Sequence, residues 1–349
     1  MTETVRRPEV PVGQQAGPVG QQAGPAGPPA PRAGGDALGT GRRGDRVFRR
    51  LSVGSAMVVL VVNVAIAVFL VAKAVPALRA NDANFLTSRD FFTSTVPPRF
   101  GIAALAYGTV VTSLVAVVLA VPVAVGVALF ISHYAPRRLA SLLGYVIDLL
   151  AAVPSVVYGL WGAQFLNQPF KGFSRFLEKW LGWIPIFHTA GGKGPYGNSL
   201  LLAGVVLAVM ILPIVAAISR EVFLQAPRTH AEAALALGAT RWEMIRVAVL
   251  PYGRPGVISA GLLGLGRALG ETIAVLLVLR ASNVVSSSLT RPGGNSIAGN
   301  IAGQFGEANP LGRGALVASG LALFVITLAV NFAARAIIAR RRDFSGTAA

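Results

Sequence analysis

Long uncharged runs of apolar residues are the feature that most restricts the fold of this 349-residue chain. A helix needs about 20 apolar residues to cross a bilayer, and six runs are long enough. They cover residues 51–75, 102–132, 139–165, 198–219, 256–279 and 314–338. Only 13% of the residues are charged, against roughly 25% in a soluble domain. The sequence therefore predicts an all-α polytopic membrane helical bundle with six transmembrane helices.

A net charge of +17 accompanies the apolar runs. Nucleic-acid binding predicts Lys and Arg interleaved with aromatic residues on a soluble fold, whereas a membrane protein retains them in its cytoplasmic segments. Here the basic residues are most frequent before the first run, after the last run, and in the loops on the same side of the membrane. We therefore expect a multi-pass protein with both termini in the cytoplasm, contact with membrane lipid, and no nucleic-acid partner.

Three parts are expected along the chain. Residues 1–45 are rich in Gly, Pro and Gln and have too few large apolar side chains to offset the entropy of ordering, so we expect a disordered cytoplasmic tail. Residues 46–342 contain the six spans, and residues 343–349 form a short cytoplasmic tail. Phe173–Trp183 has the pattern of an amphipathic interfacial helix. The chain has no cysteine and three scattered histidines, so no metal site and no cofactor is expected.

The loop at residues 220–255, between the fourth and fifth runs, has the pattern of two short capped helices. Thr229–Glu232 and Thr240–Glu243 each have the Ser/Thr-x-x-Glu spacing of a capping box. Gly238 is the small residue expected after the end of the first helix, and Leu250–Pro251 is expected to stop the second. Such a helical elbow on the cytoplasmic side is suited to docking a soluble partner.

The chain has no G-x-x-x-x-G-K-[ST] sequence that would hold the phosphates of a nucleotide. It also has neither the G-x-S-x-G nor the H-E-x-x-H hydrolase motif. We therefore expect that the chain is not an enzyme and that a partner hydrolyses any nucleotide.

Two apolar runs contain ionisable residues. In the fifth run, Arg267 and Glu271 are four residues apart, which places them on one face of a helix and within reach of each other. Arg267 lies roughly 16 Å along that span, where a charge costs about 2.5–3.5 kcal/mol or more. The pair is either a neutralised packing pair or an anion site or gate, because a guanidinium offers bidentate donors to a tetrahedral oxyanion.

In the third run, Asp148 is followed by a proline that should kink the span. Pro154 removes one backbone hydrogen bond and would free carbonyl groups beside Ser155 and Tyr158. Asp148 is either an interhelical hydrogen-bonding group or a pathway residue. Together with Arg267 and Glu271, we take Asp148 and Ser155 as candidate residues of a substrate pathway.

The elbow resembles the EAA loop of ATP-binding-cassette (ABC) importer permeases. The resemblance is carried by Glu232-Ala233-Ala234, Gly238 and Leu250-Pro251, although Ala248 stands where the family pattern has Ile. It implies a type I importer fold in which these helices sit in a groove of a separate ATPase subunit. The coupling residues it implies are Glu232, Ala233, Ala234 and Gly238.

Two further stretches, PSVVYGLWG at 154–162 and GRALGET at 266–272, resemble the phosphate-specific ABC importer permeases, the PstC type more than the PstA type. The resemblance implies a bacterial inner-membrane protein that imports inorganic phosphate by alternating access. Its implied partners are a second permease subunit of the PstA type, a PstB-like ATPase dimer and an extracytoplasmic phosphate-binding protein of the PstS type. The transport residues it implies are Arg267 and Glu271. A permease for another oxyanion, sulfate or molybdate, and a non-transporting scaffold for an ATPase remain alternatives.

Overall fold

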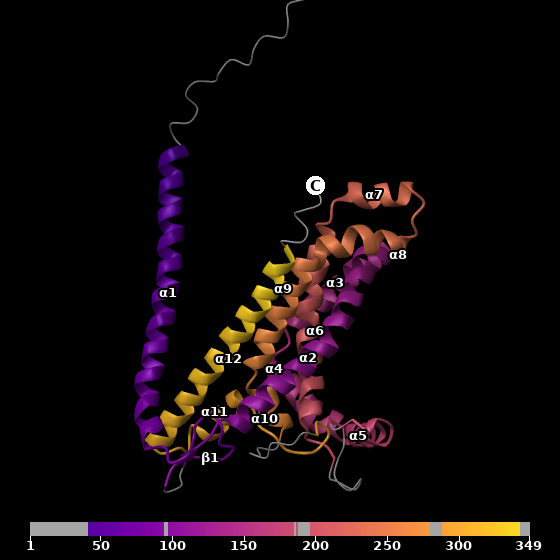
Figure 1. Cartoon of the computed structure of the whole chain (residues 1–349). Helices are drawn as coiled ribbons and strands as arrows, with labels where there is room; N and C mark the ends of the chain where they lie inside the picture. The colour runs from indigo at the N-terminus through magenta and orange to yellow at the C-terminus, as the bar shows by residue number, and fades with distance from the viewer. Residues whose placement is uncertain (1–40, 94–96, 185, 188–195, 280–287, 343–349) are drawn as a thin grey trace, which may run out of the picture. The chain divides into compact units, whose positions relative to one another are not determined.

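The structure is a computed structural model, and it describes residues 41–93, 97–184, 186–187, 196–279 and 288–342. Residues 1–40 of the expected N-terminal tail at 1–45, and the whole expected tail at 343–349, lie outside the described residues. The chain divides into two units, residues 1–62 and 63–349, which are described separately (Figure 1). Helix α1, Gly41–Ala80, crosses this boundary, and it begins inside the segment 1–45 that was expected to be a disordered tail.

In the first unit, the described residues belong to α1. Its residues 44–62 are all exposed although most are apolar. The stretch Gly44–Ala80 is long and apolar enough to cross a membrane. Such a helix is stable only where its side chains face lipid or another apolar surface.

The described residues of the second unit form helices, connecting loops and a two-stranded hairpin, in which Phe91 pairs with Phe100. Its strands are β1 (Phe91–Phe92) and β2 (Arg99–Phe100). Its α-helices after α1 are α2 (Ala103–Leu129), α3 (Arg137–Ala151), α4 (Ser155–Trp161), α5 (Asn167–Leu181), α6 (Leu200–Leu224), α7 (Arg228–Ala236), α8 (Arg241–Met244), α9 (Leu250–Leu269), α10 (Ile273–Val278), α11 (Ile297–Gln304) and α12 (Pro310–Arg342). Wider π-helical turns are η1 (Phe130–Tyr134), η2 (Gly162–Leu166) and η3 (Ile245–Val249).

The core of this unit is the contact between α2 and α6. On α2, four alanines recur at every fourth residue, Ala116, Ala120, Ala124 and Ala128, and each is at most 1% exposed. Small residues at this spacing lie on one helix face and let neighbouring helices approach closely. On α6, a Cβ at Gly204 would lie 2.7 Å from the Cβ of Val115. Close packing of small residues therefore holds the two helices together.

The elements of the second unit separate toward two ends of the bundle (Figure 1). Helices α7 and α8 lie at one end, called here the elbow end, and α5, α10 and α11 lie at the other. Helix α5 overlaps the expected interfacial helix at 173–183; it buries Phe170 and exposes Trp180.

By length and composition, four helices among the described residues can cross a membrane, or five if one bent pair is a single span. They are Gly44–Ala80, Ala103–Tyr134, Leu200–Leu224 and Pro310–Ala336, and the bent pair joins Arg137–Ala151 to Ser155–Leu181. The predicted polytopic all-α fold is confirmed, whereas the count of six spans stays a prediction.

Two predicted spans are interrupted. In the span 139–165, where a kink was expected, α3 ends at Ala151 and the chain turns by 88°. Pro154 cannot donate to the α3 backbone, so a new helix starts after it. The span 256–279 is divided into α9 and α10 at residues 270–272. Gly270 ends α9 because glycine loses the most conformational entropy in a helix.

Candidate functional site

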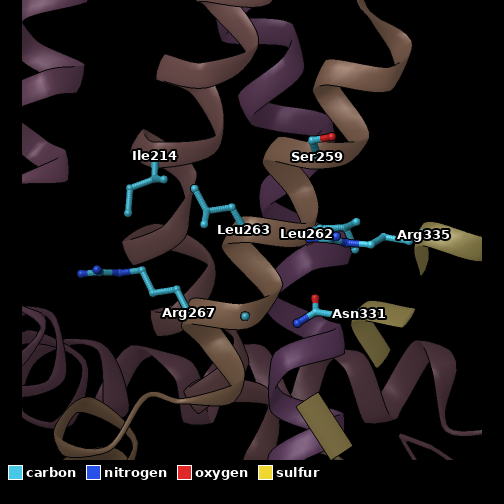
Figure 2. Close-up of a pocket in the computed structure, with 8 residues that line it drawn as sticks. Ile214, Ser259, Leu262, Leu263, Arg267, Asn331 and Arg335 are labelled. Carbon is cyan, nitrogen blue, oxygen red and sulfur yellow. The ribbon is translucent and has the colours of Figure 1, made fainter. Parts of the chain in front are cut away.

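A cavity of about 630 Å³ lies between α6, α9 and α12. Most of its wall is apolar, and its polar groups come from α9 and α12 (Figure 2). It is lined by Ile214, Ser259, Leu262, Leu263, Gly266, Arg267, Asn331 and Arg335. Of the four predicted pathway residues, only Arg267 lines this cavity.

Arg267 lies in the last turn of α9, next to Gly266. The space beside Gly266 is open, since a Cβ there would meet no atom within 4 Å. Arg267 interacts electrostatically with Tyr158 of α4. No carboxylate in the described part of the chain lies within ion-pair distance of its guanidinium. The group therefore has its charge and donors available to an anion.

The expected pairing of Arg267 with Glu271 was wrong. The prediction assumed one continuous helix, but α9 ends at Leu269 and Glu271 lies in the break before α10. The Glu271 carboxylate instead accepts a hydrogen bond of 3.2 Å from the backbone N–H of Ala274. Glu271 thus satisfies a free amide at the start of α10 and leaves Arg267 without its predicted partner.

Asp148 pairs with a residue that the sequence analysis missed. Its carboxylate lies 3.9 Å from the guanidinium of Arg220 on α6, which also lies 3.2 Å from Glu221. The Arg220 side chain is 17% exposed, and a Cβ at Gly144 of α3 would collide with it. Asp148 therefore joins α3 to α6, as an interhelical group would, and does not line the cavity. Arg220 directly follows an apolar run, so its position suggested only a flanking charge.

The break at Pro154 leaves a backbone carbonyl without its helical donor, as the sequence predicted. Pro154 cannot donate to the carbonyl of Leu150, four residues earlier. The hydroxyl of Tyr158 donates to that carbonyl instead, at 2.9 Å. Ser155 is the first residue of α4 and does not line the cavity.

Small residues bring α4 and α10 together, beside Arg267. A Cβ at Gly159 would lie 2.7 Å from the Cα of Ala274 on α10. The two interrupted helices, α3–α4 and α9–α10, are therefore packed against each other near their breaks. Breaks of this kind in membrane helices are tolerated where they are buried in protein or line a cavity.

The elbow consists of α7 and α8, joined at Gly238. Gly238 has a φ of +85°, which favours glycine. Its N–H donates to Leu235 O at 3.0 Å, and Ala239 N–H donates to Ala234 O at 3.1 Å. These two bonds form a complete Schellman motif, which ends α7 and starts the turn toward α8.

One of the two predicted capping boxes is present. Thr240 Oγ1 accepts from the Glu243 N–H at 3.3 Å, and the Glu243 carboxylate accepts from the Thr240 N–H at 2.8 Å. The box at Thr229–Glu232 was wrong, because α7 begins directly after Pro227 and Thr229 lies inside its first turn. The φ of Pro227, −59°, already suits a helix start.

The prediction that Leu250–Pro251 stops the second elbow helix was wrong. The backbone continues from α8 through η3 into α9, and Leu250 N–H donates to Ile245 O. The wider π turn fits a proline because Pro251 then lies in the first turn of α9, where its missing N–H breaks no helical bond.

The elbow is attached to the bundle by one side and exposes the other. Ala231 and Ala234 pack against a cluster that includes Phe223 and Ile245. Glu232, Ala233 and Gly238 are exposed, and Leu237 is 90% exposed. Large apolar side chains are also exposed at Leu235, Trp242 and Val247. Exposed large apolar side chains are typical of surfaces that contact a protein or a membrane.

Comparison with known proteins decides the family. The sequence profile of the family described as binding-protein-dependent transport system inner membrane component matches residues 120–343. The chain belongs to this family. As an inner membrane component, it is a multi-pass membrane protein of a transport system, and its apolar helices agree with this location.

This inner membrane component is similar in sequence to relatives that are named as phosphate permeases. It is 50% identical over 298 residues to "Phosphate transport system permease protein PstC 2" of Mycobacterium tuberculosis (strain ATCC 25618 / H37Rv), covering 85% of this chain and 92% of the relative. It is 40% identical over 299 residues to "Phosphate transport system permease protein PstC" of Xylella fastidiosa (strain Temecula1 / ATCC 700964), covering 85% and 91%. The expected resemblance to PstC-type permeases is confirmed.

A solved structure shares the fold of this inner membrane component. It is a bacterial ABC transporter involved in the import of the acidic polysaccharide alginate, with a TM-score of 0.54 and 13% sequence identity, covering 86% of this chain and 99% of that one. The likeness extends over nearly the whole of the solved chain, so the predicted ABC importer permease fold is confirmed.

Acid is expected to weaken the Thr240–Glu243 capping box at the start of α8 in this inner membrane component. The hydrogen bonds from the Thr240 backbone N–H and then its hydroxyl lower the pKa of Glu243 from its ordinary value of 4.5. A carboxyl with a lowered pKa stabilises the fold above its unfolded pKa, and this contribution is lost as the pH falls through the folded pKa. Amide hydrogen exchange at residues 240–245, corrected for the intrinsic rate, should therefore increase below about pH 4.5. In Glu243→Gln it should change little over that window; equal pH dependence in both proteins would contradict the assignment.

Proposed function

We propose that this chain is the membrane-spanning subunit of an ATP-driven importer that carries inorganic phosphate across the plasma membrane by alternating access. The observation that carries the proposal is Arg267, a guanidinium with no carboxylate partner in the described residues, in the wall of a membrane cavity. A charge at that depth is costly, and a permanent structural arginine would be neutralised by the protein. A tetrahedral oxyanion that passes through the cavity supplies the missing charge. The PstC names of the relatives make phosphate the preferred oxyanion.

The energy comes from a separate subunit, because the chain has no nucleotide-binding motif. Glu232, Ala233, Ala234 and Gly238 lie on the elbow, whose exposed face offers Leu237 to a soluble partner. We assign this face to a PstB-like ATPase dimer. Closure of the dimer would move the elbow and, with it, α9.

The remaining partners follow from the same proposal. A second permease of the PstA type would complete the pathway, and a PstS-like binding protein would deliver phosphate from outside. The distribution of basic residues supports a cytoplasmic position of both termini and of the elbow. Glu271 and Asp148 then act as structural groups outside the cavity wall, through their contacts with Ala274 and Arg220, and Ser155 is the first residue of α4.

Transport by the reconstituted complex tests the proposal. Proteoliposomes containing this chain, the second permease and the ATPase, with the binding protein added outside, are expected to accumulate radiolabelled phosphate only when ATP is inside. Radiolabelled sulfate should not accumulate. Accumulation of sulfate in place of phosphate would identify a permease for another oxyanion, and ATPase binding without accumulation of either would identify a scaffold.

A further inference from the structure

A second arginine, Arg335, lines the cavity that contains Arg267. It comes from α12, whereas Arg267 comes from α9. Figure 2 shows Arg335 reaching from α12 toward α9, near Leu262, while Arg267 extends from the other side of α9. Neither guanidinium has an ion-pair partner within the described ranges. Both side chains therefore keep their positive charge and their donors available to an anion in the cavity.

Arg335 lies nearer to the elbow than Arg267 does. Helix α9 starts at the elbow, and Ser259 precedes Arg267 by two turns, or roughly 12 Å. Helix α12 ends toward the same end of the bundle (Figure 1). Asn331 and Arg335 are four residues apart, on one face of α12, and both line the cavity. Ser259 and Arg335 therefore lie on the elbow side of Arg267, and Asn331 lies one turn of α12 before Arg335, away from the elbow end.

Retention of the C-terminus in the cytoplasm does not require Arg335. Arg340, Arg341 and Arg342 follow it in the sequence and provide the basic cluster that sets topology. An arginine that serves only topology extends into water or among lipid headgroups. Arg335 is exposed, but it also lines the same mostly apolar cavity as Arg267, which retention of the C-terminus does not require.

We infer that Arg335, together with Asn331, forms a second binding position for the tetrahedral oxyanion, on the elbow side of Arg267. The inference rests on the proposed function. The guanidinium donates to two oxygens of the anion, and the Asn331 amide can donate to a third. After Arg267 receives the anion, this position holds it on the last part of its way to the cytoplasm.

Uptake kinetics of Arg335→Gln in the complete reconstituted complex test the inference. The maximal rate of radiolabelled phosphate uptake should fall about tenfold or more, because hydrogen bonds to a charged group are lost. The KM for the phosphate-loaded binding protein should not change, because delivery takes place at the opposite end. Arg335→Lys, which keeps the charge, should recover part of the rate. Arg254→Gln is the matched control, since Arg254 is an exposed arginine of α9 outside the cavity wall.

An Arg335→Gln complex that keeps more than half of the wild-type rate would overturn the inference, as would an equal loss in Arg254→Gln. If Arg335→Gln does not assemble with the ATPase, Asn331→Asp gives the answer, because it preserves the side-chain shape and places a negative charge beside the arginine. That variant should also lose uptake, and an unchanged rate would overturn the inference. A wild-type complex that carries sulfate but no phosphate would refute the proposed function alone, and the same variants are then compared with sulfate.

Discussion

Arg267→Gln should abolish phosphate uptake while the complex still assembles. Glutamine keeps much of the length of the side chain but offers no positive charge and no bidentate fork. The loss of two charge-assisted hydrogen bonds, at about 1.5–3 kcal/mol each, corresponds to a decrease in uptake of roughly a hundredfold or more. The measurement is ATP-dependent uptake of radiolabelled phosphate by proteoliposomes, with co-elution of the subunits as the check on assembly.

Arg254→Gln and Glu271→Gln separate the explanations of this effect. The Arg254→Gln substitution removes the same charge from the same helix, but outside the cavity wall. It should leave uptake within about twofold of wild type. Glu271 accepts from Ala274 and is not paired with Arg267, so Glu271→Gln, which keeps an acceptor oxygen, should impair uptake much less than Arg267→Gln. Normal uptake by Arg267→Gln would refute the assignment of an anion site. Equal losses of uptake in Arg267→Gln and Glu271→Gln would indicate that Arg267 and Glu271 act as a pair.

Gly238→Pro should uncouple phosphate uptake from ATP hydrolysis or prevent binding of the ATPase. The backbone at Gly238 has a φ of +85° and its N–H donates to Leu235 O. Proline fixes φ near −65° and has no N–H, so the junction of α7 and α8 cannot form. We expect loss of ATPase co-purification or, if the ATPase remains bound, loss of ATP-driven uptake.

Gly238→Asn provides the graded control for this prediction. Asparagine tolerates the left-handed region better than other residues with a side chain and keeps the N–H. It should therefore retain most co-purification and uptake, with Gly238→Ala between the two because a Cβ there costs about 1–2 kcal/mol. Full ATP-driven uptake by Gly238→Pro at the wild-type yield of ATPase would contradict the coupling role of the elbow.

The sequence predicted the membrane class and the elbow because both depend on local patterns. Apolar runs define helices that can enter a bilayer, and the Thr240–Glu243 box and Gly238 act through hydrogen bonds within a few residues. The sequence did not predict where spans stop. A continuous 3.6-residue period places Arg267 and Glu271 on one face, whereas Gly270 ends that period between them.

Contacts between distant helices were not predictable from these patterns. Arg220 and Asp148 are far apart in sequence, and a single charge after an apolar run carries no information about its partner. Arg335 lies near the end of the last apolar run, where an arginine is ordinarily explained by topology. The four-residue spacing from Asn331 to Arg335 was the available signal, but its meaning depends on the cavity that α9 and α12 form together.

The unbroken backbone from α8 through η3 into α9 has a mechanical consequence. No loop lies between Arg241 and Arg267, a path of roughly 39 Å along the helical backbone. A loop would absorb a displacement of the elbow, whereas hydrogen-bonded turns resist stretching. The segment therefore connects the elbow to Arg267 by one helical path, which can bend at the π turn and at Pro255 and which ends at Gly270.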